Sequence, residues 1–314
     1  MESIIAWLNT PFTENGTLRM WMPVAAGIAI IAVLLVLFIK KRNKRKNLNP
    51  MGNDPITEQP EPLPAIEIAN LQGLGKREEQ QDAFGASLLT KYEKNGLLAV
   101  LCDGMGGMAA GGMIAGQVIN AMLEMFPWKE DKLILDAIHK LSVQVYRKFR
   151  GQGGTTLVAV RVVDGRLSFW CVGDSDLFLL REGKLYALNQ RQEYKNDLLL
   201  RALGGAFPVS DAYQDPQASA LSEYIGKEQI RCDCIRKPFK LMPEDTLLLC
   251  SDGVSDTLTL TQIKEAMILR PQDGCEKLEQ YILAADIPNQ DNYTAIVIRY
   301  HRKITEGQKY EEEN

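Results

Sequence analysis

The chain has 314 residues, of which 46% are apolar and 24% charged, and this composition excludes collagen-like, wholly disordered and disulfide-scaffold proteins. The net charge is −4, but residues 1–46 hold seven Lys and Arg against two Asp and Glu, which leaves the rest of the chain strongly acidic. An acidic body is a poor partner for a phosphate backbone, so nucleic-acid binding is disfavoured. Two histidines are too few for a His-rich metal site or a Ser/His/Asp hydrolase.

The six cysteines exclude two further classes. They form no CxxC pair, which disfavours a zinc site, and none is followed six places later by arginine, which excludes a cysteine-nucleophile phosphatase. We interpret them as the reduced thiols of a cytosolic domain.

The first predicted element is a transmembrane helix over Met20–Ile39, a run of twenty residues without a charge. At 1.5 Å per residue, a helix of this length matches the roughly 30 Å hydrocarbon core of a bilayer. Six Lys and Arg follow the run at residues 40–46, so the positive-inside rule places residues 1–19 outside the cell membrane and everything after Lys40 in the cytoplasm. In a secretory signal peptide, the basic residues would instead precede the apolar stretch.

Three further segments follow from composition. Residues 40–65 are predicted to form a basic and then Pro-rich tether, since five prolines fall in the last nineteen of these residues. Residues 66–302 are predicted to form the globular domain, and residues 303–314 an acidic tail.

Within the globular domain the apolar pattern predicts strands punctuated by helices. Strands are expected over Ala65–Ala69, Ala83–Leu89, Leu97–Cys102, Thr155–Val163, Leu167–Val172, Leu177–Arg181, Gln229–Cys234, Thr246–Cys250 and Tyr293–Tyr300. Helices are expected over Ala109–Phe126, Lys132–Arg150, Leu260–Leu269 and Cys275–Ala285. The hairpin signal Asp164-Gly165 and the two consecutive long helices predict an α+β domain, in which helices cover antiparallel sheets.

Four aspartates flank predicted strands at turns. Asp103, Asp174 and Asp252 each follow an apolar run, and Asp291 precedes the last strand. Because Asp beside Gly is a common turn former, any single instance has a purely local explanation. If the four converged, their charges would repel unless cations neutralised them, and oxygen-only ligands select hard ions such as Mg²⁺ or Mn²⁺.

The glycines after Asp103 also fit a dinucleotide-binding fingerprint, Gly104-x-Gly106-x-x-Ala109, with Glu124 twenty residues from Gly104. The context disfavours this alternative. The helix that this motif opens is followed by a second predicted helix rather than by a parallel strand, so there is no βαβ unit, and Asp103 would lie against the pyrophosphate.

Seven short blocks occur in a characteristic order: Arg77–Ala83, Asp103–Gly107, Gly153–Thr156, Val172–Ser175, Arg201–Gly204, Leu249–Val254 and Asp291–Thr294. Through these blocks and their order, the chain resembles the metal-dependent protein phosphatases of the 2C type over about residues 66–302. The methionine at position 105 is similar to what bacterial members carry there, whereas eukaryotic members usually carry histidine. The resemblance implies an α-β-β-α sandwich, in which two antiparallel sheets are flanked by helices.

The resemblance also implies a set of metal ligands. Asp103 would bridge two Mn²⁺ or Mg²⁺ ions, and the carbonyl of Gly104 would join one of them. Asp252 and Asp291 would complete the other site, and Asp174 would help to hold a third, more loosely bound ion.

Three more residues acquire roles from the same resemblance. Arg77 would bind the substrate phosphate, a task suited to a planar and permanently charged guanidinium. Arg77 and Asp103 are the two predicted catalytic residues. Asp82 would orient metal-bound water, and Gln81 would lie beside it in the second shell of the metals.

The chain departs from the family pattern at three places. Gln81 stands where many members have Glu, and Asp176 replaces the arginine usual after Gly-Asp-Ser. The segment Asn189–Glu193 replaces one that normally contains Thr, Asp and His.

The sequence thus predicts a membrane-anchored, metal-dependent serine/threonine phosphoprotein phosphatase that hydrolyses phosphomonoesters with a metal-bound hydroxide. Its partners would be phosphorylated Ser/Thr proteins at the membrane and a cognate Ser/Thr kinase, not nucleic acid. The alternative is a pseudophosphatase without catalysis, acting as a phosphoprotein-binding scaffold or sensor at the membrane.

Overall fold

The computed structural model describes residues 64–105, 110–235 and 237–301, and all of them belong to one compact unit, Pro62–Asn314. The predicted transmembrane helix, nearly all of the tether and the acidic tail therefore lie outside the described residues. Among the described residues, no helix is long and apolar enough to cross a membrane.

The first sheet joins the two ends of the domain. β1 (Ile66–Gly73) pairs along its whole length with β12 (Tyr293–Tyr300), and β12 pairs in turn with β11 (Thr246–Cys250). β7 (Asp176–Arg181) and β8 (Lys184–Ala187) complete the order β1-β12-β11-β7-β8, in which every neighbouring pair is antiparallel.

The second sheet is also antiparallel and has the order β10-β6-β5-β3-β2, with β4 beside β3 and β9 beside β6. Its strands are β2 (Asp82–Ala86), β3 (Leu97–Met105), β4 (Gly154–Thr155), β5 (Leu157–Val163), β6 (Arg166–Val172), β9 (Asp233–Cys234) and β10 (Phe239–Lys240). The predicted hairpin between β5 and β6 turns at Asp164-Gly165, where both residues have a positive φ.

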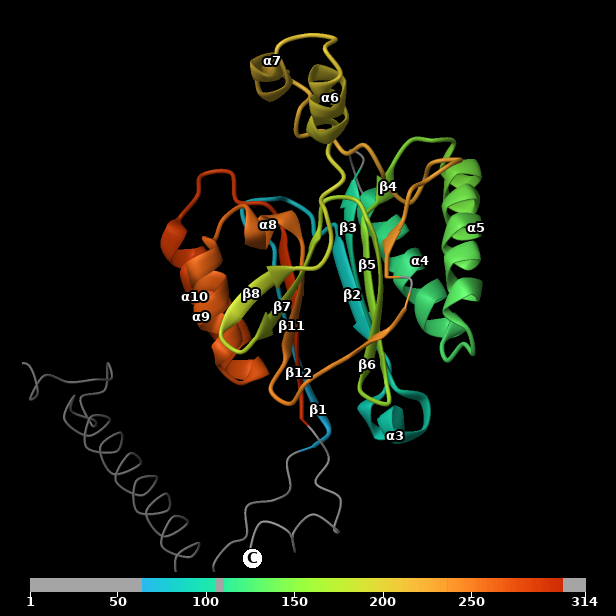
Figure 1. The fold of residues 1–314 in the computed structure, drawn as a ribbon, viewed down its shortest axis with the longest axis vertical. Helices are drawn as coiled ribbons and strands as arrows, with labels where there is room; N and C mark the ends of the chain where they lie inside the picture. The colour runs from blue at the N-terminus through green and yellow to red at the C-terminus, as the bar shows by residue number, and fades with distance from the viewer. Residues whose placement is uncertain (1–63, 106–109, 236, 302–314) are drawn as a thin grey trace, which may run out of the picture. The chain divides into compact units, whose positions relative to one another are not determined.

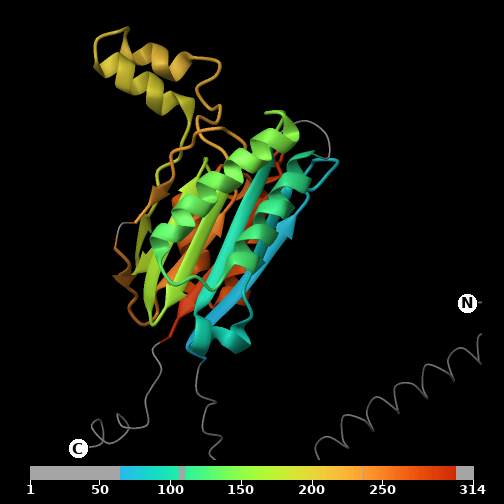
Figure 2. The ribbon, with the colours of Figure 1, turned by 90° about the vertical axis from the view of Figure 1, so that its right-hand side faces the viewer.

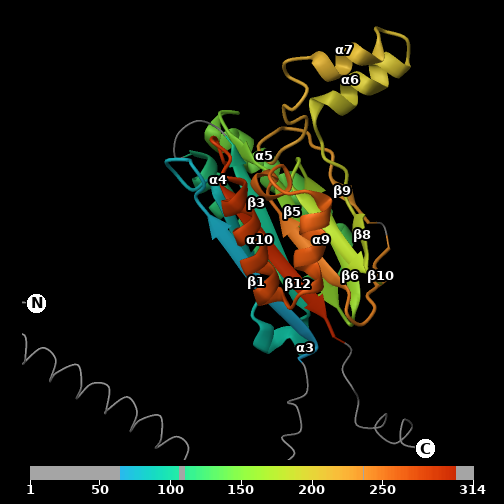
Figure 3. The same cartoon turned by 90° about the vertical axis from the view of Figure 1, so that its left-hand side faces the viewer.

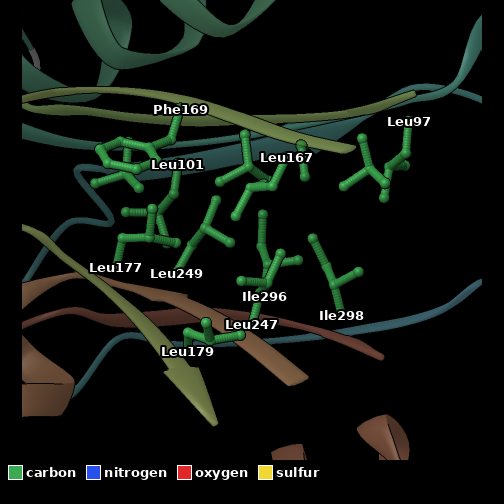
Figure 4. Close-up of a cluster of buried hydrophobic side chains, with 14 of the residues drawn as sticks. Leu97, Leu101, Leu167, Phe169, Leu177, Leu179, Leu247, Leu249, Ile296 and Ile298 are labelled. Atoms are coloured by element: carbon green, nitrogen blue, oxygen red, sulfur yellow. The ribbon is translucent and has the colours of Figure 1, made fainter. Parts of the chain in front are cut away.

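The main core lies between the two sheets. Figure 4 shows Leu101 and Phe169 of the second sheet facing Leu177 and Leu249 of the first. In β3, alternate residues of Leu97–Cys102 face this core and the helices behind it, so every one of them is fully buried. Burial of one such leucine stabilises the fold by about 1.5–3 kcal/mol.

Helices cover the outer face of each sheet. α4 (Ala110–Met125) and α5 (Asp131–Phe149) pack on the second sheet (Figure 2), and α9 (Leu260–Ile268) and α10 (Pro271–Ala285) pack on the first (Figure 3). The layers therefore run helix, sheet, sheet, helix (Figure 1). The predicted α+β class and sandwich architecture are confirmed, and the four predicted helices are present.

Two segments differ from the prediction. The strand expected over Gln229–Cys234 is reduced to the two residues of β9, because only Asp233 and Cys234 pair with β6. Two helices not predicted, α6 (Tyr194–Leu203) and α7 (Val209–Gln214), project beyond the sandwich (Figure 1). They bury few apolar side chains, and Leu200 and Leu203 of α6 are exposed.

Several short elements also escaped the sequence analysis, the strands β8 and β10 among them. A 3₁₀ turn at Leu89–Lys91 and α3 (Tyr92–Asn95) connect β2 to β3. α8 (Asp252–Ser255) follows β11 directly, and it matters for the site because Asp252 is its first residue.

Candidate active site

A cleft of about 520 Å³ opens where β3 ends. It is lined by Arg77, Glu78, Glu79, Gln81, Asp103, Gly104, Met105, Thr156, Asp174, Leu221, Asp252, Asp291 and Asn292. Of the eight site residues predicted from the sequence, seven line this cleft. The eighth, Asp82, is buried on β2 directly opposite Asp103 of β3. The structure therefore brings together aspartates that are up to 188 positions apart in the sequence.

Asp103 is fixed by its backbone. Its N–H donates to Thr156 Oγ1 at 2.9 Å, and its carbonyl accepts from Thr155 Oγ1 and from the Thr156 N–H, each at 2.8 Å. These bonds explain the Gly-Gly-Thr-Thr block, whose threonines clamp the end of β3. They leave the carboxylate of Asp103 free to face the cleft.

Close backbone contacts at the cleft require glycine at two positions. A Cβ on Gly104 would collide with the backbone of Gly111 in α4, and a Cβ on Gly253 would collide with the carbonyl of Asn292. The aspartate that precedes each glycine is thereby held against a neighbouring segment. In both places the glycine serves close approach rather than turn formation, because Gly104 lies within β3 and Gly253 within α8.

The cleft aspartates disfavour one another's ionisation. Burial, reinforced by the charges of Asp82 and Asp252 and by a hydrogen bond with Asp252, raises the pKa of Asp103 well above its usual range. Burial and the nearby Asp256 raise the pKa of Asp252. Burial and the charge of Asp252 raise the pKa of Asp174 to about 7. Cations bound among these carboxylates would offset their mutual repulsion.

Asp82 lies behind the cleft in a polar contact with β11. Its Oδ2 accepts from Ser251 Oγ at 2.8 Å, and that same Oγ accepts from the Thr294 N–H at 3.0 Å. Burial raises the pKa of Asp82 to about 6, although the hydrogen bonds from Thr294 and Ser251 act in the opposite direction. Ser251, which follows β11, thus joins the Asp82 side chain to the segments that carry Asp252 and Asp291.

Arg77 and Asp291 form an ion pair at the mouth of the cleft. Arg77 Nη2 lies 2.6 Å from Asp291 Oδ2, and both side chains are about half exposed. This contact, with the charges of Asp252 and Asp103 behind it, raises the pKa of Arg77 above its already high value. The predicted phosphate-binding cation and one predicted metal ligand are therefore bound to each other.

The donor set fits hard divalent cations. Asp252 Oδ1 is buried and has no hydrogen-bond partner among the described residues, and its carboxyl shares a hydrogen bond with Asp103. A cation would satisfy the unpaired oxygen and replace the shared proton. No three Asp, Glu, His or Cys side chains of the described part are yet arranged around one point, and Asp291 is engaged by Arg77.

Sequence reasoning missed three residues of this site. Thr156 lines the cleft and fixes Asp103, and Ser251 anchors Asp82. Asn292 accepts from the Gln81 N–H at 2.8 Å and donates to the Leu74 carbonyl at 2.9 Å, which holds the segment that carries Arg77. All three belong to blocks already noted, but only their hydrogen bonds reveal what they do.

Comparison with known proteins identifies the family. The family described as protein phosphatase 2C matches residues 74–290, well over half of the chain. The chain therefore belongs to the protein phosphatase 2C family, and the enzyme class predicted from the sequence, serine/threonine protein phosphatase, is confirmed.

Relatives and solved structures agree with this assignment. The serine/threonine phosphatase Stp of Listeria welshimeri is 26% identical over 218 residues, which cover 64% of this chain and 83% of Stp. PstP of Mycobacterium tuberculosis is 30% identical over 216 residues, or 64% of this chain and 40% of PstP. The crystal structure of the M. tuberculosis phosphatase PstP/Ppp matches with a TM-score of 0.62 at 26% identity, covering 76% of this chain and 99% of that one.

A further structure shares the fold at lower identity. The catalytic domain of PstP, solved with two manganese ions, has a TM-score of 0.61 at 24% identity and covers 76% of this chain and 99% of that one.

Proposed function

We propose that this chain is a catalytically active, Mn²⁺- or Mg²⁺-dependent phosphatase that hydrolyses phosphoserine and phosphothreonine in proteins. The observation that carries the proposal is the convergence of Asp103, Asp174, Asp252 and Asp291, from four separate segments, on a cleft that also contains Arg77. Holding buried carboxylates together costs free energy, and a protein that only bound phosphoproteins would have no use for that cost.

Two ions would be held by Asp103 together with the Gly104 carbonyl, Asp252 and Asp291, and Asp174 would contribute to a third. When bound, such ions lower the pKa of water and neutralise charge on phosphoryl oxygens. The chain's own residues position the carboxylates. Thr155 and Thr156 keep Asp103 aligned, and Asp82, anchored by Ser251, stays beside Asp103 as a second carboxylate.

Arg77 supplies the phosphate contact. Its guanidinium is half exposed at the mouth of the cleft and already pairs with a carboxylate, so its donors are placed for an anion. Binding of cations by Asp291 would release Arg77 from that carboxylate and free it for the substrate. Metal binding and phosphate binding would then be coupled through this one ion pair.

The test uses the full-length chain in detergent and a phosphothreonine peptide. Release of phosphate should require Mn²⁺ or Mg²⁺, stop with EDTA and return when metal is restored. Binding of the peptide without turnover at saturating Mn²⁺ would overturn catalysis and favour the pseudophosphatase alternative.

We also propose that Met20–Ile39 anchors the protein in the cell membrane, with residues 1–19 outside and the phosphatase domain in the cytoplasm. The support is the uncharged twenty-residue run and the basic cluster that follows it. The Pro-rich part of the tether, at about 3 Å per residue, would reach on the order of 60 Å. Phosphorylated membrane proteins, and the kinase that modifies them, would be the partners within that radius.

The placement is tested by carbonate extraction of membranes and by protease added to intact cells. The protein should stay in the membrane fraction, and its phosphatase domain should be protected. Recovery in the soluble fraction, or digestion of that domain from outside, would refute the anchor whatever the enzymology shows.

A further inference from the structure

Residues Asn189–Gln192, which we name the strap, lie along the turn that carries Asp174. The Leu177 N–H donates to Asn189 Oδ1 at 2.7 Å, and Asn189 Nδ2 donates to the Ser175 carbonyl at 2.9 Å. On the other side of Asp174, the Gly173 N–H donates to Gln192 Oε1 at 2.8 Å. The Gln192 N–H returns a bond to the Gly173 carbonyl at 2.9 Å. The strap therefore fixes both sides of Asp174.

Arg191 of the strap connects this turn to α8. Its Nε lies 3.1 Å from each carboxylate oxygen of Asp176, and its Nη2 lies 2.6 Å from one of them. The same Nη2 donates to Ser255 Oγ at 2.7 Å, and Nη1 donates to Asp256 Oδ1 at 2.6 Å. Since α8 begins at Asp252, one guanidinium joins the segments that carry two cleft aspartates.

These contacts link two departures from the family pattern. Asp176 stands where an arginine is usual, and Arg191 lies in the segment that normally contains an aspartate. In this structure the two residues bind each other, and Asp176 is almost fully buried. In this chain the two departures thus form a single ion pair, so neither has to be read as the loss of a site.

Arg191 is suited to this position because its planar guanidinium can serve three acceptors at once. Its charge also lies close enough to Asp174 and Asp252 to oppose the rise in pKa that burial causes in both. Side chains that orient metal ligands from behind commonly affect metal affinity by 10–100-fold.

We propose that Arg191 is a positioning residue of the metal centre, which aligns the Asp174 turn with the Asp252 helix so that both can bind divalent cations. The inference rests on the proposed function and extends it to a residue outside the cleft lining.

The experiment is a calorimetric titration of Mn²⁺ into metal-free, full-length protein in detergent, with Tm measured alongside. Arg191→Ala should weaken Mn²⁺ binding about tenfold or more. Arg191→Lys should recover only part of the affinity, because an ammonium cannot span Asp176, Ser255 and Asp256.

Arg181→Ala is the matched control. Asp176 is the first residue of β7 and Arg181 is the last. The Nε of Arg181 donates to both carboxylate oxygens of the buried Asp245, at 2.9 and 3.2 Å. Its loss should lower Tm but leave the Mn²⁺ affinity within about twofold, because the pair does not touch the cleft. An equal loss of Mn²⁺ affinity in this control would mean that general destabilisation is the cause, and would overturn the proposal.

Two more outcomes separate this inference from the proposed function. If Arg191→Ala does not fold, Asp256→Asn weakens the same link from a side chain that is 62% exposed, and it should also reduce Mn²⁺ affinity. Wild-type Mn²⁺ affinity in the folded Arg191→Ala protein, or in Asp256→Asn, would overturn the positioning role while leaving the phosphatase intact. Failure of the wild-type protein to bind Mn²⁺ at all would instead overturn the proposed function.

Discussion

Strand β3 contains two regions of opposite character. Leu97–Cys102 are fully buried apolar residues, and their removal from water lowers the free energy of the folded state. Asp103 extends the same strand into the cleft. There, burial and neighbouring carboxylates raise the pKa of Asp103, so its ionised form costs free energy. The difference shows how the fold holds like charges together. Burial of the apolar part of the strand stabilises the fold, and this offsets the free-energy cost of holding the acidic part close to other carboxylates.

Of the two regions of β3, the acidic one should show the largest effect of a substitution on activity, at Asp103. Under the proposed function Asp103 would be shared by two ions, so Asp103→Asn should reduce kcat/KM by about three orders of magnitude or more, the equivalent of about 4 kcal/mol of transition-state stabilisation. The Tm of the metal-free protein should stay the same or rise, since a buried carboxyl whose ionisation costs free energy is replaced by a neutral amide. Steady-state kinetics and thermal denaturation measure both quantities.

Asp164→Asn is the control for this variant, because Asp164 also precedes a glycine at a strand end but lies in the hairpin turn between β5 and β6. It should leave kcat/KM unchanged. Near-wild-type activity of Asp103→Asn at saturating Mn²⁺ would show that the cleft has been wrongly assigned.

The apolar part of β3 should respond in the opposite way. Leu101→Ala should lower the free energy of unfolding by about 2–5 kcal/mol, because it leaves a cavity between the sheets. The remaining folded molecules should keep their kcat. Urea denaturation measures the loss, and Leu200→Ala, at a position that is 68% exposed on α6, should cost little. A similar loss at both leucines would contradict the assigned core.

The acidic part should make stability depend on pH. In the unfolded chain these carboxyls have a pKa near 3.8, but in the folded protein the pKa rises to about 6 for Asp82 and about 7 for Asp174. Between about pH 4 and 7 the folded state therefore binds more protons than the unfolded state, so the stability of the metal-free protein should fall as pH rises. Each kcal/mol lost should lower Tm by about 2–4 °C.

Mn²⁺ should reverse this trend, and its stabilising effect should be larger at pH 7 than at pH 5, because protons compete for the same oxygens. Thermal denaturation across this range, with and without Mn²⁺, measures the effect. A metal-free Tm that rises steadily from pH 4 to 7 would show that the aspartates are not held together as described.

The smallest effect is expected at the mouth of the cleft. Arg77→Ala should raise KM for a phosphopeptide and lower kcat/KM about 10–100-fold, the equivalent of one charge-assisted contact. Its Mn²⁺ affinity should not fall, because the substitution frees Asp291. Lys76→Ala is the matched control, since Lys76 is an exposed cation paired with Asp286 at 3.6 Å. Loss of metal binding in Arg77→Ala would make Arg77 a structural residue.

The sequence predicted much of the fold because its main elements are strongly patterned. A short apolar run such as Leu97–Cys102, bounded by turn residues, is typical of a buried strand, and the long helices carry apolar faces. The helices α6 and α7 could not be found in this way, because they bury little. α8 is too short to show any period.

The site was predictable as a set of residues but not as a geometry. The ordered blocks indicated the aspartates and Arg77 through their resemblance to the phosphatase 2C family. The pairing of Arg77 with Asp291 and of Asp176 with Arg191 joins residues that are distant in the sequence. Such contacts depend on which strands become neighbours, and local pattern carries no information about that.

The pairing of β1 with β12 has a consequence for how the domain could be rebuilt. Ile66 lies opposite Tyr300, and the His301 N–H donates to the Ala65 carbonyl at 2.8 Å, so the chain enters and leaves the sheet at adjacent points. A short linker between these points, with new termini opened at the exposed β7–β8 turn Glu182–Gly183, should give a circular permutant with the same fold and the same cleft. The order in which the strands are synthesised is therefore separable from the architecture that they form.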